Sequence, residues 1–139
     1  MAKTALEKLG VKPGAAAWAP GRPDALADVL PLSTGDAPPA PPDVIVAFVH
    51  AAADVAPALA RALPHYRPGK ALWFAYPKKT GAIRTDLTRD RGWEPLADAG
   101  LLGVTQIAID ATWSALRFRR RREIKTLTRR SERREPPAG

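Results

Sequence analysis

Basic and hydroxyl-bearing residues follow one apolar run of this 139-residue chain. The run from Ala71 to Tyr76 has the composition of a buried strand, and Pro77 ends it. In an open α/β sheet, ligands bind just beyond the carboxyl ends of the strands, where loops converge. Cationic and hydroxyl groups at such a position suit an anion such as phosphate or carboxylate. The predicted ligand-binding residues of this loop are Lys78, Lys79, Thr80, Arg84, Thr85, Asp86 and Arg89.

Two further residues are predicted to lie at the same rim of the sheet. His50 ends the run DVIVAFVH, the strongest predicted strand, and Trp113 begins a later strand. The Trp113 ring could stack on a base or sugar of a ligand. Each residue also has a structural interpretation, because a lone histidine usually supports the fold, and Trp93 and Trp113 could anchor the last helix and the hairpin to the core.

The charges of the loop also have a second interpretation. Arg84 and Arg89 could pair with Asp86 and Asp90 on a solvated surface, where ion pairs contribute little. Either aspartate could act as a base, but helix capping and local pairing are the commoner roles. We favour Asp90 as the N-cap of a helix over residues 92–99.

Several kinds of site are excluded or disfavoured by composition. The chain has no cysteine, so it forms no disulfide and no cysteine-containing metal site. His50 and His65 are the only histidines, and we therefore expect no zinc site of the usual kinds. The serines have no local nucleophile signature, and no hydrolase triad can be assembled from them.

No run of the chain approaches the roughly twenty apolar residues that a membrane span needs. The N-terminal sequence MAKTALEKLG also lacks the uninterrupted apolar segment of a signal peptide. We expect a soluble, cytoplasmic protein with no membrane partner. The sequence predicts no particular oligomeric state.

The net charge of +8 is unevenly distributed along the chain. Residues 1–116 contain 12 Lys/Arg against 11 Asp/Glu, whereas residues 117–139 contain 10 against 3. As an alternative function, this C-terminal segment could bind nucleic acid through phosphates without reading sequence; it could equally be a solvated, partly helical or disordered extension. The predicted nucleic-acid-binding residues are Arg119, Arg120, Arg121, Arg122, Lys125, Arg129 and Arg130.

Strand and helix patterns alternate along the chain. The predicted elements are helices over 4–10, 24–30, 54–63 and 92–99, and strands over 15–19, 43–50, 71–76, 104–109 and 113–118. We predict a three-layer, Rossmann-like α/β domain over residues 4–119, with a mostly parallel five-stranded sheet and a terminal antiparallel hairpin strand. Strand 113–118 is expected beside strand 71–76. Residues 120–139 are expected to form a basic, disordered tail.

The runs LWFAYPKKTGAIRTDLTRDRGW and IDATWSALRFR carry a resemblance to known proteins. They resemble an uncharacterised bacterial family of small domains of unknown function with a YPKK…TDLTRD…GW…WSALRF pattern. The resemblance covers most of residues 6–119. It implies a truncated Rossmann-like sheet of the methyltransferase type and no established reaction.

The chain departs from the methyltransferase pattern where a cofactor would bind. The first loop of that pattern needs glycines, but here AWAPGRP has one glycine and two prolines. Only Asp36, inside a proline-rich segment, could supply the acidic residue that holds ribose hydroxyls. We therefore predict no cofactor, no S-adenosylmethionine binding and no methyltransferase activity, with a divergent methyltransferase as a further alternative. The leading hypothesis is a domain that binds an anionic ligand at loop 77–90.

Overall fold

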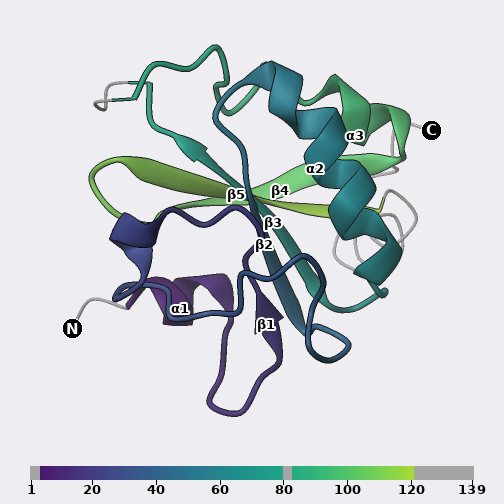
Figure 1. The fold of residues 1–139 in the computed structure, drawn as a ribbon. Coiled ribbons are helices and arrows are strands. Elements are labelled where there is room, and N and C mark those ends of the chain that lie inside the picture. Colours follow the sequence, from purple (N-terminus) through teal and green to yellow (C-terminus); the bar gives the residue numbers. More distant parts are fainter. Residues whose placement is uncertain (1–3, 80–82, 121–139) are drawn as a thin grey trace, which may run out of the picture.

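The computed structural model describes residues 4–79 and 83–120 of the chain. These residues form a five-stranded sheet with the spatial order β1-β2-β3-β5-β4 (Figure 1). The strands are β1 (Ala17–Trp18), β2 (Val44–Phe48), β3 (Ala71–Pro77), β4 (Leu101–Ala108) and β5 (Trp113–Arg120). The α-helices are α1 (Ala5–Leu9), α2 (Val55–Ala62) and α3 (Glu94–Asp98). Three short 3-10 helices, η1 (Asp24–Leu26), η2 (Ala52–Asp54) and η3 (Leu63–His65), complete the described elements.

The sheet is mixed, and the prediction of a mostly parallel, three-layer Rossmann-like domain is wrong. The pairs β1–β2 and β2–β3 are parallel, whereas β3–β5 and β5–β4 are antiparallel. Helices are also few and short in the described residues, with α2 the longest at eight residues. Doubly wound folds need a helix in each crossover between parallel strands, and here only α2 supplies a regular one.

Prolines explain why the first crossover lacks a regular helix. The predicted helix over 24–30 is only the single 3-10 turn η1. Pro23 precedes this turn, and five prolines follow between Pro31 and Pro42. Because proline removes a backbone donor and clashes with the preceding turn, this segment crosses the sheet as an irregular connection.

The predicted position of the last strand is confirmed. β5 lies antiparallel beside β3, so the hairpin places β4 at the edge of the sheet. The connection after β4 is closed locally, because the Asp110 Oδ1 atom accepts hydrogen bonds from the backbone N–H groups of Thr112 and Trp113. Such a side-chain-to-backbone turn fixes the register of the hairpin.

Each face of the sheet has its own core. On one face α2 and α3 pack together over the strands, with Leu59 and Leu96 in contact with a cluster that includes Phe74. On the other face Leu9 of α1 and Leu26 of η1 belong to a second cluster (Figure 1). All five residues of β2 are buried, as expected for a strand covered on both faces.

None of the helices in the described part of the chain has the length and apolarity that crossing a membrane requires.

Candidate functional site

The chain that follows β3 folds back over the helical face of the sheet. The Asp86 Oδ1 atom accepts a hydrogen bond from the backbone N–H of Ala52 at 2.8 Å, which fixes the loop to the start of η2. One residue later, the Leu87 side chain is fully buried. The Trp93 Nε1 group donates to the Thr88 carbonyl at 2.7 Å and closes the far end of the loop. These contacts hold Arg89 at a defined place above the sheet.

Gly92 permits this tight return of the chain. Its backbone has φ of +101°, in the region that favours glycine. A Cβ atom at this position would overlap with the Cδ2 atom of Leu87. The loop therefore depends on a residue without a side chain here.

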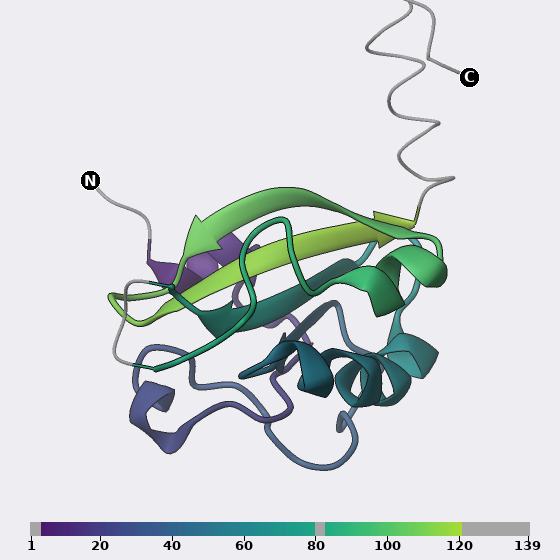
Figure 2. The same cartoon turned by 90° about the horizontal axis from the view of Figure 1, so that it is seen from above.

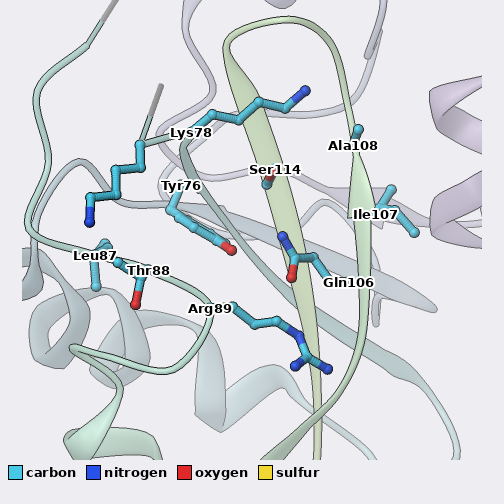
Figure 3. Close-up of a pocket in the computed structure, with 10 residues that line it drawn as sticks. Tyr76, Lys78, Leu87, Thr88, Arg89, Gln106, Ile107, Ala108 and Ser114 are labelled. Carbon is cyan, nitrogen blue, oxygen red and sulfur yellow. The ribbon is translucent and has the colours of Figure 1, made fainter. Parts of the chain in front are cut away.

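The loop, β3 and the β4–β5 hairpin enclose a groove of about 550 Å³. Its floor is formed by residues that pair with each other across β3, β5 and β4. Tyr76 of β3 pairs with Ser114 of β5, which in turn pairs with Ala108 of β4. Gln106 lies on the same face of β4, because it is two residues from Ala108 on the strand. The complete lining, seen in Figure 3, consists of Tyr76, Lys78, Lys79, Leu87, Thr88, Arg89, Gln106, Ile107, Ala108 and Ser114.

The positive charges border this groove at separate places. The Lys78 backbone N–H donates to the Thr112 carbonyl at 2.8 Å, which puts Lys78 beside the end of the hairpin. Arg89 reaches from the opposite loop toward β4 (Figure 3). Arg89 also lines a neighbouring hollow of about 310 Å³ together with residues 101–103, so it lies along the middle of β4. The groove thus carries cations at both ends rather than at one point.

Tyr76 supplies a neutral donor at the base of the groove. Burial raises the pKa of its hydroxyl; Arg89 opposes this shift and Asp90 adds to it. The phenol is therefore protonated at neutral pH and able to donate a hydrogen bond. In Figure 3 its hydroxyl points into the groove on the side of Gln106. Ser114, also buried, adds a second hydroxyl beside it.

The other predicted site residues are spread over neighbouring hollows. Another hollow, of about 540 Å³, is lined by Arg84, Thr85 and Asp86 and shares Lys79 with the groove. His50 lines a separate hollow of about 320 Å³, together with Asp54 and Arg61. Thr80 lies outside the described residues. The structure therefore brings Lys78, Lys79 and Arg89 together and leaves Arg84 and His50 elsewhere.

The tryptophans belong to the core. Trp113 and Trp93 are both buried. Trp113 packs edge-on against Phe48, with the ring centres 5.1 Å apart, and against His50, with the ring centres 5.3 Å apart. Trp93 packs in the same way against Tyr76, again with 5.3 Å between the ring centres. The structural interpretation of these rings is the one that the fold supports.

The aspartates of the loop have roles other than those we favoured. Among the described residues, no ion pair joins Asp86 or Asp90 to Arg84 or Arg89; the ion pairs found there join Asp43 to Arg67 and Lys70. Asp90 is not the cap of α3, because the helix begins after Trp93 without a side-chain capping bond. The loop cations therefore remain available to a ligand.

The C-terminal cations are only partly described. Arg119 and Arg120 belong to β5, and the Arg120 guanidinium lies 5.4 Å from the centre of the Tyr66 ring. The remaining predicted nucleic-acid-binding residues, Arg121, Arg122, Lys125, Arg129 and Arg130, lie outside the described residues. Within the described residues, no group of three or more histidine, aspartate or glutamate side chains is placed to hold a metal ion.

Sequence reasoning missed Tyr76, Ser114 and Gln106 as groove residues. Each is a polar residue near the end of a different strand, and no local pattern of the sequence joins the three. Only the cross-strand register groups them, and the register follows from the hairpin and from β3–β5 pairing.

A scan against protein-family models finds no match to this chain, and a search of curated proteins finds none either.

Proposed function

We propose that the groove between β3, the β4–β5 hairpin and the loop after β3 binds a ligand that carries phosphate or carboxylate groups. The observation that carries this proposal is the charge of the lining. Lys78, Lys79 and Arg89 all border the groove, and no carboxylate is among its described lining residues. Cations around one groove that has no acidic lining residue favour the binding of an anion between them.

Hydrogen-bonding groups support the same ligand class. An arginine guanidinium can bind a carboxylate or phosphate through two parallel hydrogen bonds. The hydroxyls of Tyr76, Thr88 and Ser114 line the same groove and can donate to the remaining oxygens.

Calorimetric titration with inorganic pyrophosphate and with citrate tests the proposal. The titrations are made at low ionic strength, because salt screens exposed charges. Arg89→Gln removes the cation but keeps a polar side chain of similar length, and it should weaken binding by about 1.5–3 kcal/mol. The free energy of unfolding should change by less than about 1 kcal/mol, since Arg89 is exposed.

Two matched variants locate the binding site. Arg61→Gln removes an exposed cation of α2 that does not line the groove, and binding should be unchanged. Arg84→Gln removes a cation of the hollow that Thr85 and Asp86 also line, and it should have a smaller effect than Arg89→Gln. Equal losses in all three variants would mean that the probes respond to overall charge, and the proposal would fail.

A further inference from the structure

The two edges of the sheet differ in how well they are closed. β1, at one edge, has only two residues, and its outer side is occupied by Ser33. The backbone N–H of Ala19 donates to the Ser33 carbonyl at 2.7 Å. β4, at the other edge, has eight residues and pairs only with β5 among the described residues. Figure 2 shows β4 along the outer margin of the sheet.

The sequence of β4 lacks most of the features that protect edge strands. Leu101–Ala108 reads LLGVTQIA, with no charged residue and no proline. Natural edge strands usually carry such residues, because unpaired backbone N–H and C=O groups otherwise recruit another strand. Two features protect this edge in part: the irregularity between Gly103 and Thr105, and Lys8 of α1, whose Nζ donates to the Ala108 carbonyl at 3.2 Å. They leave residues 105–107 in regular pairing with β5.

The open edge adjoins the cationic groove. Gln106, Ile107 and Ala108 of β4 line the groove, and Leu101–Gly103 line the neighbouring hollow that also contains Arg89. A strand added outside β4 would place alternate side chains on the groove face, about 7 Å apart. Arg89 is the groove cation beside β4, because it lines both hollows, whereas Lys78 follows β3 and lies two strands further in.

We infer that β4 accepts an extended, acidic polypeptide segment of a partner protein as an additional antiparallel or parallel strand. Backbone hydrogen bonds to β4 supply affinity, and a carboxylate on the groove face of the segment supplies selectivity by pairing with Arg89. This inference rests on the proposed function, since it names a carboxylate-bearing partner for the same groove.

Charge favours an acidic partner over a second copy of this chain. If two copies paired antiparallel through β4 around a two-fold axis, the groove faces of both would lie on the same side of the joined sheet. Arg89 of each copy would then lie on that side, near the shared edge, and the two cations would repel.

Three peptides of eight residues, the length of β4, separate strand pairing from charge. The first alternates glutamate and valine and is blocked at both ends. The second keeps every glutamate but has proline in place of valine, so it cannot form a full ladder of hydrogen bonds. The third alternates lysine and valine. Binding to the full-length protein is followed by the backbone amide signals of β4 in NMR titrations.

We expect the glutamate–valine peptide to bind at least about tenfold more tightly than the proline peptide, since several backbone hydrogen bonds are lost in the latter. The β4 amides that point away from β5 should become protected from exchange only with the first peptide. Gln106→Glu should weaken its binding by about tenfold through repulsion, whereas the matched Gln106→Lys should keep or strengthen it.

Each contrary result has a distinct meaning. Equal affinity for the two acidic peptides, or for the lysine peptide, would overturn strand addition of an acidic segment. A β4–β4 dimer seen by sedimentation without peptide would overturn it as well, because the edge would already be occupied. Pyrophosphate binding without peptide binding would end this inference alone, whereas failure of both probes would end the proposed function too.

Discussion

The parallel and antiparallel halves of the sheet differ in how much of them the rest of the chain covers. Every residue of β2 is buried, whereas most of β4 is exposed. Parallel strands require crossover connections, and these carry covering segments onto both faces. The β4–β5 hairpin needs only a short turn and brings no cover. The candidate groove lies where the covered half meets the open one, so the parallel half supplies rigidity and the hairpin supplies access.

Substitution of one isoleucine in each half should show this difference as a difference in the free energy of unfolding. Ile45→Ala in β2 removes a fully buried side chain and should lower the free energy of unfolding by about 2–5 kcal/mol. The same substitution of Ile107 in β4, which is only half-buried, should cost less than about 1.5 kcal/mol. Denaturant unfolding measures both. Similar losses of stability would mean that β2 and β4 are equally well packed, and this would contradict the difference in burial between them.

Gly92 does not line the groove, but a side chain there would displace Leu87, which does. Gly92→Ala should destabilise the protein by about 1–3 kcal/mol beyond the cost of a left-handed alanine, because the new methyl group overlaps with Leu87. Gly100→Ala is the matched control: its φ is +83° and nothing lies within 4 Å of the added atom, so only about 1–2 kcal/mol is expected.

Pyrophosphate binding distinguishes the two glycine variants further. Gly92→Ala should weaken it, since Arg89 lies three residues away on the same loop, whereas Gly100→Ala should leave it unchanged. A Gly92→Ala protein with unaltered stability and binding would show that the loop tolerates a side chain there.

The buried Tyr76 hydroxyl, in the strand where the two halves meet, gives the stability of the sheet a dependence on high pH. Because burial raises the pKa of Tyr76 in the folded protein above its ordinary value of 10.0, folding favours the protonated phenol. Its contribution to stability is therefore complete below about pH 10 and decreases as the pH rises through the higher, folded-state pKa. Denaturant unfolding between neutral and strongly alkaline pH should show this loss, and Tyr76→Phe should reduce it. An identical alkaline profile in the variant would contradict the shift.

The C-terminal segment should affect the stability of the sheet least. Removing residues 121–139 leaves β5 intact, since the strand ends at Arg120, and should hardly change the thermal transition. If the segment binds nucleic acid through phosphates, the truncation should abolish a binding that falls steeply with salt and shows little sequence preference. Undiminished binding by the truncated protein would place the nucleic-acid contacts in the sheet domain instead.

The comparison of the two halves also shows what the sequence can predict. Continuous apolar runs identified β2 and β3. The hairpin spacing around Asp110, together with the resemblance, predicted the place of β5 beside β3. The Rossmann-like assignment was wrong because the segment 24–30 forms only a single 3-10 turn and only two of the four strand pairs are parallel. Local patterns identify strands well, but they do not show whether a connection becomes a helix.

The candidate site was predictable only in its charged part. Lys78, Lys79 and Arg89 are recognisable as a basic stretch after a buried strand. Tyr76, Ser114 and Gln106 join them through cross-strand pairing, which no local pattern shows. The separation of Arg84 from Arg89 depends on the hydrogen bond between Asp86 and Ala52, a contact between distant parts of the chain.

Mapping of anion binding by NMR tests the central claim, that the groove at the open half of the sheet is an anion site. In a pyrophosphate titration at low ionic strength, we expect the largest amide shifts at Tyr76, Arg89, Gln106 and Ser114, all of them lost in Arg89→Gln. Shifts concentrated instead around His50 and Arg61, or in residues 121–139, would contradict the account.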